Sequence, residues 1–80
     1  GAAAAGGGAI LAPKPGKVIA VDVADGDTVT AGQRLMVLEA MKMEHALTAP
    51  FSGTVTDLNA SEGGQVQVEA VLCVVEPNLK

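Results

Sequence analysis

Residues 9–39 read AILAPKPGKVIAVDVADGDTVTAGQRLMVLE, and residues 46–76 read ALTAPFSGTVTDLNASEGGQVQVEAVLCVVE. The two segments align without a gap at an offset of 37 residues, and ten of the 31 aligned positions are identical. Self-similarity at a fixed spacing is the signature of a structural unit that is built twice. The sequence therefore predicts one fold made of two copies, and residues 40–45 join them.

Each copy contains short Val-rich runs separated by Gly, Asp, Asn and Pro, without the capped 3.6-residue periodicity of a helix. This pattern is typical of strands and turns. Gly26 and Gly63 occupy matching turns, and Pro13 and Pro50 occupy matching strand ends, where a missing amide proton is tolerated. We expect strands at residues 10–12, 17–23, 28–30, 34–40, 43–49, 54–59, 65–67 and 71–76.

Each copy thus supplies four short strands, and a sheet of that size exposes an apolar face that it cannot bury alone. We expect the two copies to pack face to face. The predicted fold is all-β: a flattened barrel or sandwich of two four-stranded antiparallel sheets with pseudo-two-fold symmetry, that is, a barrel-sandwich hybrid. The offset of 37 relates Lys42 to the two chain ends, so Lys42 should lie at the opposite end of the domain from both termini.

The chain of 80 residues has room for one domain, which we place at residues 9–77. Residues 1–8 are all Ala or Gly and are predicted to form a flexible linker, and residues 78–80 a C-terminal tail.

The composition argues against several classes of function. A net charge of -4 and a single aromatic residue, Phe51, disfavour nucleic acid as a partner. No apolar run approaches the roughly 20 residues of a membrane span. One cysteine, Cys73, cannot form an internal disulfide, and its match to Met36 in the repeat predicts a buried, unreactive side chain. We expect an isolated domain of this kind to be a monomer in the cytoplasm, or in the mitochondrial matrix if the source is a eukaryote.

The sequence offers no catalytic machinery of its own. It lacks a phosphate-binding glycine loop, clustered metal ligands and a plausible nucleophile with a base. His45 is predicted to be an exposed cross-strand residue, and without further ligands it gives no metal site. We therefore expect a non-enzymatic module.

The joint between the copies is unusual. The strands predicted at 34–40 and 43–49 leave Met41 and Lys42 as a two-residue turn, and such turns prefer positive φ and residues like Asn-Gly. Where a sequence breaks a local rule, a functional requirement is the expected cause. The alternatives at this point are a lysine presented for function and a lysine that is simply a solvated turn residue.

The stretch Ala40-Met41-Lys42-Met43 resembles the signature of biotinyl domains, the biotin carboxyl carrier domains of biotin-dependent carboxylases. The resemblance extends from about residue 10 to residue 76, because that family also has an internal repeat with its lysine on the central hairpin. It implies that Lys42 carries biotin in an amide bond. It also implies that a biotin protein ligase reads the flanking residues, namely Ala40, Met41, Met43 and Glu44.

By the same resemblance, the biotin would shuttle a carboxyl group from a biotin carboxylase site to a carboxyltransferase site. The run Met43-Glu44-His45 is more similar to carriers of acyl-CoA carboxylases than to those of pyruvate carboxylase. The sequence departs from the pattern of that family in two places. The gapless repeat leaves no room for the protruding insertion (thumb) that some carriers have between the second and third strands. Glu69 replaces the glycine found at Gly32, so the turn after Gln67 is expected to have a different shape.

Two rival readings remain open. Lipoyl domains have a similar fold and also modify a hairpin lysine, but they typically have an acidic residue directly before it. A rigid spacer, similar to the hybrid barrels of membrane-fusion proteins, would leave Lys42 unmodified.

Overall fold

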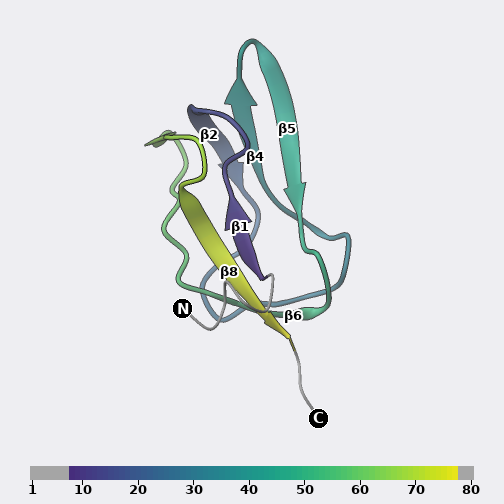
Figure 1. The fold of residues 1–80 in the computed structure, drawn as a ribbon. Helices are drawn as coiled ribbons and strands as arrows, with labels where there is room; N and C mark the ends of the chain where they lie inside the picture. Colours follow the sequence, from purple (N-terminus) through teal and green to yellow (C-terminus); the bar gives the residue numbers. More distant parts are fainter. Residues whose placement is uncertain (1–7, 78–80) are drawn as a thin grey trace.

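The computed structural model describes residues 8–77, and within that range all regular structure is β-strand. No helix in this range is long and apolar enough to cross a membrane. The strands in chain order are β1 (Ala9–Leu11), β2 (Gly16–Val21), β3 (Thr28–Val29), β4 (Arg34–Ala40), β5 (Met43–Thr48), β6 (Gly53–Thr56), β7 (Gln65–Val66) and β8 (Val71–Pro77). Figure 1 shows their arrangement.

Every predicted strand is present, and the bounds agree to within one residue except at the ends of β2 and β6, which come two and three residues earlier than expected. β2 stops at Val21 instead of residue 23. The next amide, that of Asp22, still donates a hydrogen bond to the carbonyl of Leu35 at 2.8 Å, but it is no longer part of the strand. β6 stops at Thr56 instead of residue 59, because Asp57 takes a φ of 51°, which a strand cannot contain.

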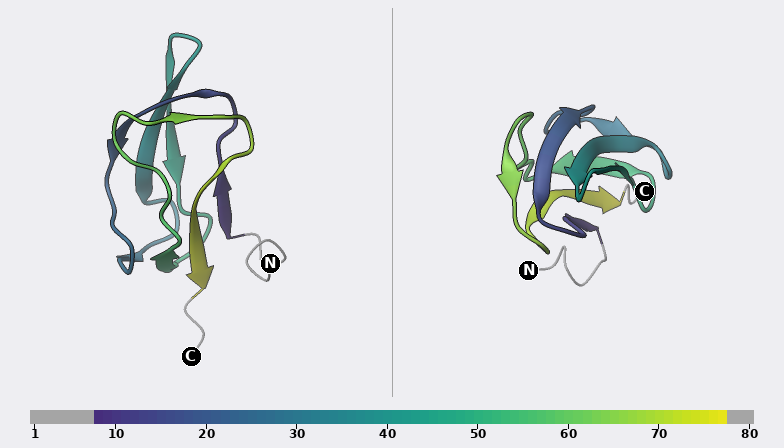
Figure 2. Two further views of the ribbon diagram at one scale, coloured as in Figure 1. Left: turned by 90° about the vertical axis from the view of Figure 1, so that its left-hand side faces the viewer. Right: turned by 90° about the horizontal axis from the view of Figure 1, so that it is seen from above.

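The strands form two antiparallel sheets of four, with the orders β1-β8-β6-β3 and β5-β4-β2-β7. The predicted fold class is therefore confirmed, and β2 and β3 are joined by residues 22–27 alone, without a thumb. The prediction that each copy forms its own sheet is wrong. Each sheet takes two strands from each copy, so the backbone groups of one copy are satisfied largely by hydrogen bonds to the other. Seen from above, the strands enclose the core as a flattened barrel (Figure 2).

The pseudo-two-fold symmetry exchanges the two sheets. Ala9 pairs with Val74 and Ile10 with Cys73 in the first sheet, and the offset of 37 turns these pairs into Ala46 with Val37 and Leu47 with Met36, which are the observed pairs of β4 and β5. The register shift between Ile10 and Leu11 also recurs between Arg34 and Met36. The repeat in the sequence is therefore a repeat of hydrogen-bond register.

The core lies between the sheets and is lined by matched residues. Among its members are the pairs Val18/Val55, Leu35/Leu72 and Met36/Cys73, each side chain being at most 1% exposed. The prediction that Cys73 is a buried filler is confirmed. Burial raises the pKa of its thiol to about 11, with a smaller contribution from Asp25, so the thiolate needed for reactivity is disfavoured.

The turn before β8 has the same shape as its counterpart, contrary to expectation. Glu69 adopts a φ of 65° and Gly32 a φ of 84°. The Glu69 amide donates to the carbonyl of Ala12 at 2.7 Å, as the Gly32 amide does to that of Ala49 at 2.8 Å. The backbone hydrogen bond to Ala12 holds the turn in this shape, so Glu69 lies in the left-handed region although it is not a glycine.

The described chain begins and ends at the end of the barrel opposite the β4–β5 hairpin (Figures 1 and 2). Gly8, assigned by sequence to the linker, is buried, and its carbonyl accepts a hydrogen bond from the amide of Val75 at 2.8 Å. The rest of the predicted linker (1–7) and the tail (78–80) lie outside the described residues.

Candidate functional site

The hairpin of β4 and β5 carries the candidate site. Its register runs from Arg34 opposite Thr48 to Ala40 opposite Met43, which leaves Met41 and Lys42 as the turn. Their φ angles are 53° and 67°, so both central residues are left-handed, as in a type I′ turn. The two-residue turn predicted from the sequence is confirmed, and it is built from two residues that disfavour that conformation.

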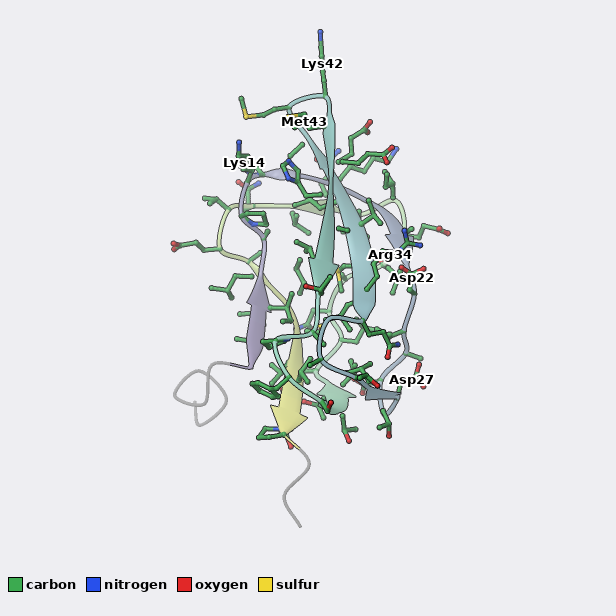
Figure 3. All side chains as sticks on the ribbon, turned by 90° about the vertical axis from the view of Figure 1, so that its right-hand side faces the viewer. Lys14, Asp22, Asp27, Arg34, Lys42 and Met43 are labelled. Carbon is green, nitrogen blue, oxygen red and sulfur yellow. The ribbon has the colours of Figure 1, made fainter. Side chains whose placement is uncertain are left out.

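Lys42 lies at the outermost point of the molecule. The hairpin rises beyond the β1–β2 loop and beyond β7 (Figure 2, left), and the Lys42 side chain extends from its tip into solvent (Figure 3). Within residues 8–77 its amine has no ion pair or hydrogen bond. A lysine in this position is accessible to a large partner from most directions.

Two methionines flank the lysine, and both are exposed. Met41 is 75% and Met43 61% exposed, the largest values among the exposed large hydrophobic side chains. Met36, by contrast, is fully buried in the core. These apolar side chains leave most of their surface exposed in the isolated domain, as is expected of a contact surface for another molecule.

Ala40 differs from its neighbours because it is only 3% exposed. Its methyl group lies against Gly16: a Cβ added at Gly16 would come within 3.0 Å of the Ala40 Cβ and 2.3 Å of the Glu39 carbonyl oxygen. Strands β2 and β4 thus approach closely beneath the turn, and Ala40 shapes the hairpin from the inside. The structure explains the small residue at this position by packing.

Glu44 is exposed on the side of the hairpin, directly opposite Glu39, and Glu39 lies opposite Lys17 on β2. Like charges facing each other across a strand pair are unfavourable, and the lysine on the next strand offsets this. The hairpin therefore presents a carboxylate-rich outer face close to its tip.

The prediction that His45 is an exposed residue is wrong. It lies opposite Leu38, whose side chain is in the core, so its ring is turned inward and is partly buried. Its Nε2 atom is buried and has no hydrogen-bond partner within the described residues. The mistake arose because Glu44 and His45 are adjacent in sequence but face opposite sides of β5.

At the other end of the hairpin, an ion pair ties β4 to the end of β2. Arg34 Nε donates to Asp22 Oδ2 at 2.6 Å (Figure 3), and the hydrogen bond to Asp22 raises the pKa of the guanidinium further above its ordinary value. The pair is exposed and contributes little to stability, and β4 is positioned on β2 chiefly by the backbone ladder between them.

One neighbour of the tip was missed by sequence reasoning. Lys14 Nζ lies 3.9 Å from the Met41 sulfur, across 27 residues of chain. Nothing in the local sequence indicates this contact, because it depends on the β1–β2 loop passing beneath the hairpin.

The surroundings of Lys42 offer no metal-binding cluster in the part of the chain that the structure describes, because no group of three His, Cys, Asp or Glu side chains within residues 8–77 could hold a metal ion. A primary amine on a rigid, projecting turn, flanked by apolar side chains, can be acylated by an enzyme and can then present the attached group. These are the requirements of a covalent carrier of a prosthetic group.

Comparison with known proteins identifies that group. Residues 8–75 match the family described as "Biotin-requiring enzyme". The chain belongs to this family. Its cofactor is biotin, and the family match covers residues 8–75 of this biotinyl domain.

The relatives of this biotinyl domain are parts of carboxylases. It is 48% identical over 71 residues to the mitochondrial methylcrotonoyl-CoA carboxylase subunit alpha of Oryza sativa subsp. japonica, covering 89% of this chain and 10% of that protein. It is 47% identical over 60 residues to the biotin carboxyl carrier protein of acetyl-CoA carboxylase from Solanum lycopersicum, covering 75% of this chain and 86% of that sequence.

A solved structure shows the same fold. The biotinyl domain superimposes on part of a single-chain, multi-domain long-chain acyl-CoA carboxylase with a TM-score of 0.77 and 32% identity, covering 89% of this chain and 7% of that one. The chain thus spans about a tenth of the length of its multi-domain relatives.

Proposed function

We propose that Lys42 is the attachment residue of biotin and that this domain carries a carboxyl group between two active sites of a biotin-dependent carboxylase. The observation that carries the proposal is the position of Lys42: a free amine at the tip of a projecting hairpin in a domain whose family requires biotin. When bound, biotin supplies a ureido nitrogen that can accept and give up a carboxyl group.

Loading would form an amide between the Lys42 Nζ and the carboxyl carbon of biotin, while one C–O bond of that activated carboxyl group would break, its oxygen would leave with the activating group, and the nitrogen would lose a proton. Nothing near Lys42 in the described structure can remove that proton or activate the carboxyl group, so a biotin protein ligase must supply both functions. Exposure does not single out Lys42, since Lys14 and Lys17 are exposed as well. Selection is therefore made by the shape of the turn and by its flanks.

We propose that the residues flanking Lys42 contribute to this selection in two different ways. Met41, Met43 and Glu44 project from the hairpin and are available for contact with a ligase. Ala40 is buried, so it contributes by setting the close approach of β2 and β4. The rigid turn holds the amine away from the barrel, where an active-site cleft can admit it.

We also propose that the parent enzyme is of the acyl-CoA carboxylase type, with biotin carboxylase and carboxyltransferase domains as partners. Support comes from Met43-Glu44-His45 and from the rice, tomato and long-chain acyl-CoA carboxylase relatives.

Intact-mass analysis tests the attachment site. The chain is co-expressed separately with a biotin protein ligase and with a lipoate ligase, and a Lys42→Arg variant is treated in the same way. We expect one biotin adduct on the wild-type chain and none on the variant, with no lipoyl adduct on either. A biotin adduct on Lys42→Arg would refute the assignment, a lipoyl adduct would favour the lipoyl carrier, and no adduct at all would favour an unmodified spacer.

A further inference from the structure

We propose that Leu11, Val68 and Val71, together with Lys14, form a side patch on which a catalytic domain of the parent carboxylase docks while the hairpin enters its active site. The inference rests on the proposed function and adds to it a surface and the chemistry of its partner. The partner face that fits is an apolar hollow with a carboxylate at its edge.

The apolar part of the side patch is contiguous. Leu11 and Val71 are register partners on β1 and β8, and they are 43% and 44% exposed. The hydrogen bond from the Glu69 amide to the carbonyl of Ala12 holds the preceding loop against the end of β1, and there Val68 is 54% exposed. Apart from the methionines of the hairpin tip, these are the large hydrophobic side chains that the described structure leaves exposed.

The internal symmetry shows that the fold does not require apolar residues at these positions. The residues related to Leu11, Val68 and Val71 by the offset of 37 are Thr48, Ala31 and Arg34. Thr48 and Arg34 are register partners, just as Leu11 and Val71 are. The same backbone thus carries a polar pair on one sheet and an apolar pair on the other, and the difference calls for a cause outside the fold.

The side patch leads toward the lysine hairpin through Lys14. The chain runs from Leu11 into the loop that contains Lys14, whose ammonium lies 3.9 Å from the Met41 sulfur. A partner that covers Met41 and Leu11 must therefore also cover Lys14.

Charge defines the partner further. In the described residues Arg34 is paired with Asp22, and Lys17 faces Glu39, whereas Lys14 has no carboxylate partner. In a chain with a net charge of -4, an unpaired lysine beside an apolar patch is suited to an acidic group on another molecule.

The small size of the side patch favours a catalytic domain over a ligase. Three apolar side chains and one charge give a weak, reversible contact. A weak contact is sufficient when carrier and catalytic domain belong to one polypeptide, because the tether raises the effective concentration. The long-chain acyl-CoA carboxylase, of which this domain matches 7%, is a single-chain, multi-domain protein.

The test uses the biotinylated 80-residue chain as substrate for the rice methylcrotonoyl-CoA carboxylase subunit alpha from which its own carrier domain has been removed. The variant L11T/V68A/V71R gives each of the three positions the residue that the other copy holds at the equivalent position, namely Thr48, Ala31 and Arg34. We expect its KM for carboxylation to rise about fivefold while kcat stays unchanged, since the loss is one of docking. The rate of biotinylation by the ligase should not change.

A charge-reversed pair provides the matched control. Lys14→Glu and Lys17→Glu change the net charge equally, and only the first should raise KM, with an effect that shrinks in high salt. A milder variant, L11S/V71T, covers the case in which V71R unfolds the domain, and thermal unfolding checks each protein. Unchanged KM in the folded variants overturns the inference, as does a slower ligase reaction with unchanged KM. No carboxylation of the wild-type chain would instead count against the proposed function.

Discussion

Glu69 adopts a left-handed backbone conformation that a residue with a side chain disfavours, and it is not part of the lysine hairpin. It occupies the left-handed turn that Gly32 occupies in the other copy, with a φ of 65°. A residue with a Cβ is strained there.

Glu69→Gly should therefore stabilise the domain by about 1 kcal/mol, because glycine adopts this φ without steric cost. The reverse change, Gly32→Glu, should destabilise it by a similar amount. Urea denaturation of both variants measures the two effects, and opposite shifts of the midpoint are expected. Equal destabilisation by both changes would show that the Glu69 side chain makes a contribution that its φ does not reveal.

The buried thiol of Cys73 should make the stability of the domain depend on pH. Its thiol pKa is raised to about 11 in the fold from 9.0, chiefly by burial. Between these values the unfolded chain loses the proton and the folded chain keeps it. The unfolded state thus binds fewer protons, and stability falls as the pH rises from 9 toward 11.

Cys73→Val keeps an apolar side chain of similar volume and removes this titration. We expect the free energy of unfolding of the wild type to fall by about 2 kcal/mol more than that of the variant between pH 8 and pH 11. The comparison is made by denaturant titration at each pH, and the lysines, which also titrate in this range, are common to both proteins. Parallel pH profiles would contradict a thiol that ionises only on unfolding.

At the scale of the element, the hairpin combines a stiff ladder with an unfavourable turn. β4 is buried along most of its length, and its pairing with β5 continues to Ala40 and Met43, so the turn has no freedom to relax. Met41 and Lys42 are held at positive φ by the strands. Lys42, the proposed attachment residue, is therefore also one of the two strained residues of the turn.

Replacing the turn should therefore separate stability from function. Met41→Asn combined with Lys42→Gly supplies the residues that a type I′ turn prefers and should raise stability by about 1–2 kcal/mol. The same variant should accept no biotin. Thermal unfolding and intact mass measure the two outcomes, and Met41→Asn alone is the control that retains the lysine. Loss of stability in the double variant would mean that Met41 and Lys42 make stabilising contacts beyond the turn.

At the scale of the whole molecule, the interleaved sheets make the two copies dependent on each other. Each sheet draws two strands from each copy, and β4, the most buried strand of its sheet, lies between β5 and β2, which come from different copies. Dividing the chain at the hairpin would therefore leave both sheets incomplete.

A fragment of residues 1–41 should be unfolded as a monomer. If the copies formed separate sheets, the fragment would retain strand structure at any concentration. Circular dichroism over a range of concentrations distinguishes the two architectures, with the full chain as reference. Strand structure that appears only with dimerisation would agree with the pseudo-two-fold register, whereas a stable folded monomer would contradict the interleaving.

Local sequence patterns were sufficient to predict much of the structure of this protein. The repeat, all eight strands, the fold class and the two-residue turn at Met41 and Lys42 follow from glycine and proline positions and from apolar runs, which act over a few residues. The resemblance that the flanks of Lys42 carry to biotinyl domains likewise needs only contiguous sequence, and the family match agrees with it.

Tertiary structure decided what depends on residues far apart in the chain. The exchange of strands between copies, the burial of Ala40 against Gly16, the inward turn of His45 and the contact of Lys14 with Met41 all arise from strand pairing and loop crossing. The offset of 37 aligns equivalent positions but does not say which copy each strand pairs with. That choice is made by the hydrogen bonds and apolar surface that the two copies satisfy together, which no single stretch of the sequence contains.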